Sequence, residues 1–293
     1  MTTEISTLNT ANFAEMAQAM GMGADMKKAP AKSSTLPRLR IWNQAEMGEV
    51  EVNGKKKKME VVPAGMYRLQ LPDDKFVYAE SASLRVFVQR FMYKRYVSEN
   101  KMYVKTLMAE DLNGDLKDNT GGFNCGKPAG YVEDFKSLPK ATQDLIKQIK
   151  RVRVLLGEVK LNNAVDSEGN EVDMDVSPFI WEIDNRDAFK TMGMPFTELG
   201  RQKRLPVQHW INCGTEEHNL PTGASFFLPT QSLDLSSSIE LAEADQATFQ
   251  NFIEWVGNYN QYIVNAYNEN MGKQRMSEDD EALVEDFIDI DED

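Results

Sequence analysis

The sequence contains little cysteine and no long hydrophobic run, and each shortage excludes a class of protein. Two cysteines in 293 residues, Cys125 and Cys213, exclude a disulfide scaffold and suit a reducing compartment. No stretch of 18 or more apolar residues occurs, so no membrane-spanning helix is predicted. The first part of the chain carries Glu4 and Glu15 and no basic segment, which is untypical of a secretory signal. We therefore expect a cytoplasmic protein with no membrane partner.

Histidine is also scarce, which argues against hydrolytic catalysis. The two histidines have no serine or cysteine in a nucleophile-elbow sequence beside them, so a catalytic triad has little support. We therefore expect no enzyme activity and no cofactor. A structural zinc site is the alternative, with the candidate ligands Cys125, His209, Cys213 and His218. All four would be needed and no CxxC pair is present, so ordinary packing of buried cysteines is the favoured interpretation.

One glycine-rich segment resembles a phosphate-binding loop. Residues 121–127 read GGFNCGK and fit the spacing G-x-x-x-x-G-K. The next position, where Ser or Thr would hold magnesium, is Pro128, and the preceding segment is polar and not a buried strand. We interpret the segment as a glycine-rich turn.

Acidic residues dominate the total charge but are unevenly distributed. The chain has 33 Lys and Arg against 46 Asp and Glu, a formal net charge of -13. Ten of the acids lie in residues 277–293, which contain no Lys or Arg, so residues 1–276 carry a net charge of -3. Within that part, residues 37–105 have 14 bases and 8 acids. The acidic total therefore does not argue against a nucleic-acid partner for the body of the chain.

The acidic end has features of a recognition motif. Blocks of like charge stay solvated and often act as interaction tails, although a purely solubilising end is the simpler alternative. Apolar side chains interrupt the acids here, which favours docking on another protein. The predicted partner-binding residues are Asp286, Phe287, Ile288, Asp289 and Ile290.

The apolar pattern divides the chain into three parts. Residues 1–35 read as a flexible arm, able to dock on another subunit, or as a frayed terminus. Residues 36–271 are mostly strand-like, with a hairpin turn at Asn53-Gly54, a helix after Pro139 and a second helix over about 245–269. Residues 272–293 are predicted to be a disordered acidic tail. We expect an α+β fold, mainly β: an OB-like small barrel or a curved antiparallel sheet with an inserted helix and a C-terminal helix.

The most informative segment is a long strand, Leu84–Tyr96, rich in basic and aromatic residues. Strict alternation would place six of its side chains on one face: Arg85, Phe87, Gln89, Phe91, Tyr93 and Arg95. Such a mixture is typical of platforms that stack unpaired bases, each base contributing about 1–3 kcal/mol. The equal alternative is a core face with Phe87 and Phe91 inside and the cations at its rim.

Other basic and aromatic residues are candidates for the same surface. The full set of predicted nucleic-acid-binding residues is Arg38, Arg40, Trp42, Arg85, Phe87, Phe91, Tyr93, Lys94, Arg95, Tyr96, Lys105, Arg151, Arg153, Arg201, Lys203 and Arg204. Residues Lys55–Lys58, at the predicted hairpin tip, could follow phosphates or could simply be solvated.

With its β-rich body, its basic-aromatic strand at Leu84–Tyr96 and its acidic tail at Ser277–Asp293, the chain resembles the single-stranded DNA-binding proteins of bacteriophages. The resemblance implies an OB-type barrel that coats and protects single-stranded DNA in replication, recombination and repair, in the host cytoplasm. It also implies that the tail competes for the DNA groove and recruits polymerase, helicase or primase. Two features differ: the compact Cys/His zinc knuckle of some members is absent, and Phe287 lies six residues before the end.

Two other functions stay open on the sequence. One is a non-enzymatic interaction scaffold or virion-associated protein, in which the acidic tail is the functional part. The other is a metal-dependent nuclease or other replication enzyme, because carboxylates are plentiful.

Overall fold

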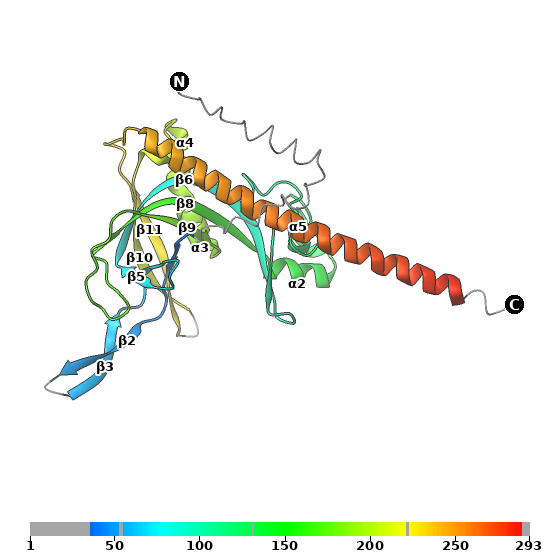
Figure 1. The fold of residues 1–293 in the computed structure, drawn as a ribbon, viewed down its shortest axis with the longest axis horizontal. Coiled ribbons are helices and arrows are strands. Elements are labelled where there is room, and N and C mark those ends of the chain that lie inside the picture. Colours follow the sequence, from blue (N-terminus) through cyan, green and yellow to red (C-terminus); the bar gives the residue numbers. More distant parts are fainter. Residues whose placement is uncertain (1–35, 53–54, 131, 221–222, 289–293) are drawn as a thin grey trace, which may run out of the picture. The chain divides into compact units, whose positions relative to one another are not determined.

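The computed structural model describes residues 36–52, 55–130, 132–220 and 223–288, with side chains described as far as Lys273 except at Val50 and Val52 (Figure 1). The chain divides into two units, residues 1–35 and 36–293. The first unit, with the arm predicted there, lies outside the described residues.

Nine strands form one curved mixed sheet. Its order is β11-β10-β6-β8-β9-β1-β4-β5, and β7 pairs with the C-terminal end of β6. The strands are β1 (Arg38–Ile41), β4 (Tyr67–Gln70), β5 (Phe76–Ala79), β6 (Ser81–Val97), β7 (Met102–Lys105), β8 (Lys150–Asn162), β9 (Ser177–Ile183), β10 (Ile211–Asn219) and β11 (Ser225–Leu233). The predicted long strand is therefore β6, at the centre of the sheet, paired with β8 from Ser81 to Lys94.

The sheet curls but does not close. Its two ends approach each other through single hydrogen bonds: the Tyr67 hydroxyl donates to the Gly214 carbonyl at 3.0 Å, and the Thr215 hydroxyl donates to the Gly65 carbonyl at 2.8 Å. No ladder joins β11 to β5 among the described residues. The expected α+β, mainly β class is confirmed, whereas the structure is a curved open sheet and not a closed barrel. The main core fills the inside of the curve, with Leu84, Leu155 and Phe179 fully buried.

The helices are α2 (Lys140–Gln148), α3 (Arg186–Thr191), α4 (Met194–Arg201) and α5 (Glu243–Ile288), and short 3-10 turns occupy Asn124–Gly126, Phe135–Ser137 and Pro206–Gln208. α2 is the helix predicted after Pro139. α5 crosses the sheet opposite the main core, where Phe252 and Val256 are buried against strands β6 and β8 (Figure 1).

α5 is longer than the sequence pattern predicts. We expected it to end near Glu269 and residues 272–293 to be disordered, but the backbone is helical as far as Ile288. Apolar periodicity indicates only the part of a helix that packs against the rest of the fold, here against β6 and β8. Residues 270–288 contain no proline, and ten of these 19 residues are Ala, Leu, Met, Arg, Lys, Gln or Glu, so their intrinsic propensity favours continuing the helix.

A β-bulge at Phe87 decides which side chains of β6 share a face. Val86 pairs with Gly157 and Val88 pairs with Leu156, so Phe87 is an extra residue without a partner. A Cβ at Gly157 would lie only 2.1 Å from the carbonyl oxygen of Arg85, so glycine is required opposite the bulge.

The bulge makes the prediction of one continuous basic-aromatic face wrong. Arg85, Phe87 and Val88 all lie on the face covered by α5, which we call the α5 face. Gln89, Phe91, Tyr93 and Arg95 lie on the opposite face, which continues the main core and which we call the inner face. Strict alternation cannot foresee this, because it assumes one residue per step on both strands.

Strands β2 (Glu46–Val52) and β3 (Lys55–Val62) form a separate two-stranded sheet, which we call the ribbon. This is the predicted hairpin, and its turn at 53–54 lies outside the described residues. The ribbon begins beside a small core of Val62, Met66 and Tyr78 and extends beyond the nine-stranded sheet (Figure 1).

Candidate nucleic-acid interface

The cations on the α5 face are matched by carboxylates. Arg85 is buried and its guanidinium lies 2.7 Å from Asp245 at the start of α5 and 3.3 Å from Glu158. Burial alone would lower the pKa of Arg85, but these two carboxylates raise it above its ordinary value. Arg90 contacts Glu110 at 3.8 Å. Arg85 therefore forms buried ion pairs within the fold, whereas Arg90 has only an exposed carboxylate beside it.

Lys94 and Lys105 are matched in the same way. Their ammonium groups lie 3.3 and 3.4 Å from the carboxylate of Glu182 on β9. Burial would raise the pKa of Glu182, but Lys105, Lys94 and Arg38 together hold it below its ordinary value.

The inner face carries cations beside aromatic rings instead. Cross-strand pairing places Phe91 opposite Arg153 and Tyr93 opposite Arg151, so the two types of side chain alternate between β6 and β8. Phe189 of α3 completes the arrangement, since the guanidinium carbons of Arg151 and Arg153 lie 5.2 and 4.6 Å from its ring centre. We call this group the cation–aromatic cluster, and its members are Phe91, Tyr93, Arg95, Lys127, Arg151, Arg153 and Phe189.

The four cations of the cluster have no carboxylate partner among the described side chains within 4.0 Å. Arg151 is exposed, and Arg95 and Lys127 are half-buried. The Nε of Arg95 is buried without a hydrogen-bond acceptor. Burial and the nearby charge of Arg151 lower the pKa of Lys127, whose ammonium group lies 5.5 Å from the ring centre of Tyr93. The acceptors of the Lys127 ammonium group are the backbone carbonyls of Pro128 and Gly130, at 2.8 and 2.6 Å. The cluster thus holds four cations without a described carboxylate partner.

Arg153 is the deepest member of the cluster. It is 8% exposed, and burial lowers the pKa of Arg153 to about 10. Its guanidinium donates to the side-chain carbonyl of Gln89 and, at 3.2 Å, to the backbone carbonyl of Phe189. Phe91 and Phe196 add ring contacts at 5.1 and 5.8 Å. Arg153 therefore adds positive charge beneath Phe91 and Phe189, which are only half-buried.

The remaining predicted site residues lie elsewhere. Trp42 packs at the base of the ribbon, where the Arg68 guanidinium stacks on its ring at 3.4 Å. Tyr96 is half-exposed and packs on Tyr103 on the β6–β7 hairpin. The others are on β1 or near the end of α4: Arg38, Arg40, Arg201, Lys203 and Arg204. Of these, Arg201 contacts Glu198 and Arg204 donates to the Leu235 carbonyl, so both interact locally.

The structure thus brings together five of the predicted residues: Phe91, Tyr93, Arg95, Arg151 and Arg153. It adds Lys127 and Phe189, which the sequence pattern did not single out for this surface. Phe189 comes from a short helix distant in sequence, and Lys127 belongs to the glycine-rich turn. No local pattern marks either residue, because only folding brings them to β6 and β8.

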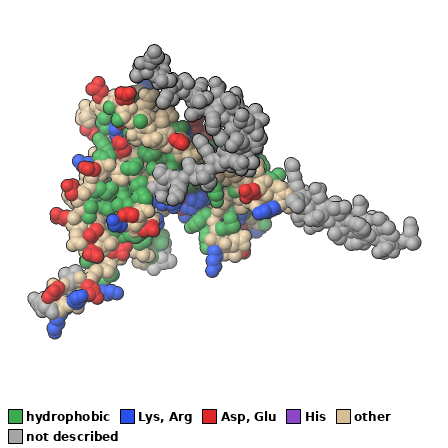
Figure 2. Space-filling model, viewed as in Figure 1, with side chains coloured by type: hydrophobic (Ala, Val, Ile, Leu, Met, Phe, Trp, Pro, Cys, Tyr) green, Lys and Arg blue, Asp and Glu red, His purple; other side chains and the backbone are tan. Residues whose placement is uncertain are grey.

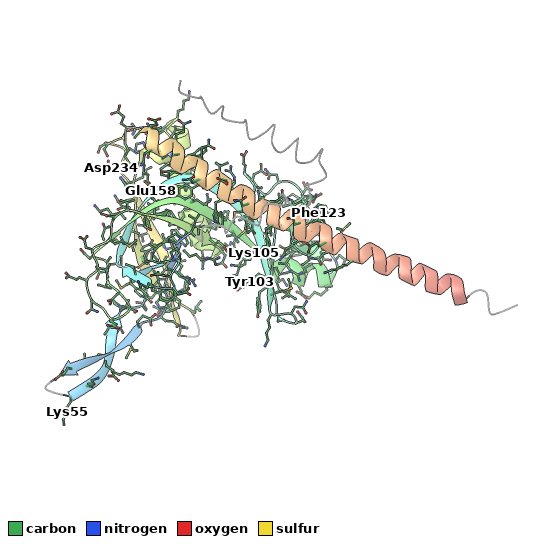
Figure 3. The ribbon with its side chains drawn as sticks, in the orientation of Figure 1. Lys55, Tyr103, Lys105, Phe123, Glu158 and Asp234 are labelled. Atoms are coloured by element: carbon green, nitrogen blue, oxygen red, sulfur yellow. The ribbon has the colours of Figure 1, made fainter. Side chains whose placement is uncertain are left out.

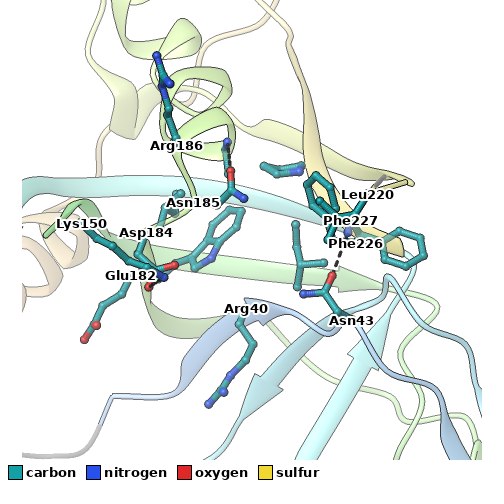
Figure 4. Close-up of a pocket in the computed structure, with 15 residues that line it drawn as sticks. Arg40, Asn43, Lys150, Glu182, Asp184, Asn185, Arg186, Leu220, Phe226 and Phe227 are labelled. Carbon is teal, nitrogen blue, oxygen red and sulfur yellow. Dashed lines mark hydrogen bonds and ion pairs between the residues drawn. The ribbon is translucent and has the colours of Figure 1, made fainter. Parts of the chain in front are cut away.

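A cavity of about 580 Å³ opens where β1 and β9 separate (Figure 4). These parallel neighbours pair at Arg38 and Ile180, and the cavity is lined by Trp181 of β9 and Phe227 of β11, among others. Its charged lining residues have both signs: Arg40, Lys150, Glu182, Asp184 and Arg186. Because the cations of this cavity are mixed with acids, it is a weaker candidate for binding a polyanion than the cation–aromatic cluster.

The glycine-rich turn is organised around a carboxylate. Buried Asp118 accepts hydrogen bonds from the backbone N–H groups of Thr120, Gly122 and Cys125, at 2.9 to 3.1 Å. In a phosphate-binding loop such N–H groups would point at the phosphate. Here these N–H groups already donate to Asp118, in agreement with the interpretation of the segment as a glycine-rich turn.

The candidate zinc ligands do not come together. Cys125 packs with Tyr93 and Val104, whereas Cys213 packs in the main core. Burial raises the pKa of both thiols to about 12. His209 is buried on the Asp234 carbonyl at 3.2 Å, and His218 is half-buried. The described part of the chain contains no group of three or more His, Cys, Asp or Glu side chains placed to hold a metal.

Two further predictions reach the edge of the described residues. The side chains of Asp286, Phe287 and Ile288 and the whole of Asp289 and Ile290 lie outside them. Among the described helices, none is long and apolar enough to cross a membrane.

Comparison of the chain with models of known protein families, with curated proteins and with solved structures found no match.

Proposed function

We propose that the protein binds single-stranded DNA through the cation–aromatic cluster. One observation carries the proposal: Arg151 and Arg153 lie against the half-buried rings of Phe91 and Phe189, and the four cations of the cluster have no described carboxylate partner within 4.0 Å. Phosphates would supply the missing negative charge, and unpaired bases would stack on Phe91 and Phe189. Such contacts recognise the backbone and the faces of the bases, so we expect weak dependence on sequence.

The acidic C-terminal segment fits the proposal as a competitor for the same cations. Residues 277–293 carry ten carboxylates and no Lys or Arg. Its displacement by DNA would expose the apolar and acidic residues 286–290 to polymerase, helicase or primase. Truncation after Met276 is therefore expected to raise DNA affinity at low salt, where electrostatic competition is strongest.

The test is the anisotropy of a labelled oligo-dT titrated with protein at low salt. The double variant Arg95→Gln/Arg151→Gln is expected to bind about tenfold or more weakly, because two phosphate contacts are lost. The matched control is Lys160→Gln/Lys75→Gln, which removes two exposed cations outside the cluster.

Equal losses in both double variants would mean that total charge and not the cluster governs binding. No binding by the wild type or by the truncated protein would overturn the proposal and favour an interaction scaffold. Magnesium-dependent shortening of the oligonucleotide would instead indicate a nuclease.

A further inference from the structure

The ribbon has two free edges that carry opposite charge. β2 contributes Glu46, Glu49 and Glu51, and the first four residues of β3 are Lys55–Lys58. Within the described ranges, neither strand pairs with any strand other than its ribbon partner. Figure 3 shows Lys55 at the far end of the ribbon, away from the sheet. Each edge therefore presents backbone N–H and C=O groups that no strand uses.

Only the base of the ribbon is anchored to the rest of the fold. There Val62 is fully buried, and the Tyr78 hydroxyl donates to Glu46 at 2.9 Å. Farther out every described side chain from Lys55 to Glu60 is exposed, and Met47 and Met59 are 55% and 45% exposed. Acidic and basic side chains lie close together along it (Figure 2). An isolated two-stranded ribbon is at best marginally stable in water, so a pairing partner would stabilise it.

We propose that the β3 edge of one molecule pairs with the β2 edge of a second copy, so that lysines face glutamates across the contact. Opposite charges on directly facing residues of paired strands are favourable and like charges are unfavourable. Lysines on an edge strand often prevent pairing. Here they oppose pairing of β3 with β3, and the glutamates oppose pairing of β2 with β2. The charge pattern therefore selects the unlike edges.

This contact uses a different surface on each partner, so it leaves one β2 edge and one β3 edge free at the ends of any assembly that does not close. Heterologous contacts of this kind either close into rings or continue as open chains. Copies joined in this way would bind neighbouring stretches of DNA cooperatively, a consequence that rests on the proposed function. The contact between copies does not depend on DNA.

The test is sedimentation velocity of the full-length protein without DNA at low salt. The wild type is expected to sediment faster as its concentration rises, and added salt is expected to reverse this because the contact is electrostatic. Glu49→Lys/Glu51→Lys makes both edges basic, and Lys56→Glu/Lys58→Glu makes both edges acidic. Each variant alone is expected to associate about tenfold or more weakly, and an equimolar mixture is expected to recover association.

Within the wild-type ribbon Lys56 forms an ion pair with Glu49 at 3.2 Å. A fourfold variant that carries all these changes keeps opposite charges facing each other across the ribbon and exchanges the charge of the two edges. It is expected to associate like the wild type, which separates loss of complementarity from loss of ribbon structure. The control Asp73→Lys/Lys75→Glu reverses an exposed pair on another turn and should change nothing.

A wild type that sediments as a monomer at every concentration would overturn the proposal. So would double variants that associate normally, or a fourfold variant and a mixture that both stay monomeric. DNA affinity is measured on the same samples. Binding of DNA without association would contradict only this inference, and association without binding of DNA would contradict only the proposed function.

Discussion

The two faces of the β6–β8 pair hold their cations in opposite ways. On the α5 face, Arg85, Arg90 and Lys94 each contact a carboxylate, and α5 covers the apolar residues between them. On the inner face, Arg151 and Arg153 lie against aromatic rings, and neither they nor Arg95 has a carboxylate within 4.0 Å among the described side chains. The pair of strands thus has ion-paired cations on one face and, on the other, the unpaired cations of the proposed binding surface. The bulge at Phe87 shifts the alternation of β6, so odd-numbered side chains lie on the α5 face before it and on the inner face after it.

The largest effect on this difference between the two faces is expected from a change that shifts the alternation of side chains along β6. Deleting Met92 would send Lys94 to the inner face and Tyr93 and Arg95 under α5, so we expect no folded protein. Deleting Phe87 removes only the extra residue and keeps every other side chain on its present face. We expect this variant to fold with a loss of about 2–4 kcal/mol, from its contact with Phe252.

Circular dichroism and urea unfolding distinguish the two deletions. If both fold equally well, or if neither folds, the bulge does not set the faces of β6 as described.

The next effect is on the α5 face. Arg85→Met would leave Glu158 and Asp245 without their cation, and removal of one partner from a buried ion pair typically costs about 3–5 kcal/mol. These carboxylates are partly solvated, at 25% and 16% exposure, so we expect about 2–3 kcal/mol in urea unfolding. Oligo-dT affinity, measured where the variant is folded, should change less than twofold. A large loss of affinity would mean that Arg85 belongs to the DNA-binding surface.

A smaller stability effect is expected on the inner face. Arg153→Met removes a buried cation that has no described carboxylate partner, so relief of its desolvation offsets the lost hydrogen bonds and ring contacts. We expect the free energy of unfolding at pH 7 to change by less than about 1 kcal/mol. If Arg153→Met lowers the free energy of unfolding as much as Arg85→Met, the ring contacts of Arg153 stabilise the fold as much as the ion pairs of Arg85 do.

The pH dependence of Arg153 has a definite sign. Burial lowers its pKa to about 10 in the folded state, below the ordinary 12.5. At pH 7 the group is charged in both states, so the cost of burying the charge is fully present. That cost falls as pH rises through about 10, because the folded state releases its proton first. The stability of the wild type relative to Arg153→Met should therefore increase above pH 10, as measured by paired urea titrations.

The smallest expected effect concerns salt. If Arg151 neutralises one phosphate, Arg151→Gln should reduce the slope of log affinity against log salt by about 0.7, the value for one contact to a single strand. Lys160→Gln, on the same strand but outside the cluster, should leave the slope unchanged. The titrations are the oligo-dT titrations repeated over a range of salt concentrations. Equal slopes for wild type and Arg151→Gln would place the DNA elsewhere.

Much of the fold follows from local patterns. The ribbon, the long central strand, the helix after Pro139 and the packed part of α5 were all predictable, because each has its own periodicity or turn residues. The candidate site was predictable only in part. Alternation gives correct faces only within an uninterrupted strand, and the bulge places Arg85 and Phe87 opposite to Phe91 and Arg95.

The partners of each cation were not predictable. Asp245 and Glu182 reach Arg85 and Lys94 from segments far away in sequence, and Phe189 reaches Arg153 in the same way. Whether an arginine is an ion-pair partner under a helix or an unmatched charge beside a ring depends on what the fold places beside it.

The sequence by itself determined that the chain is β-rich, that its acids are concentrated at one end, and that its central strand mixes cations with aromatic rings. These are properties of composition and of spacing along the chain. Only the tertiary structure decided which of those cations are neutralised and which are not. Neutralisation requires a carboxylate within a few ångströms in space, and the bulge, α3 and α5 determine those distances.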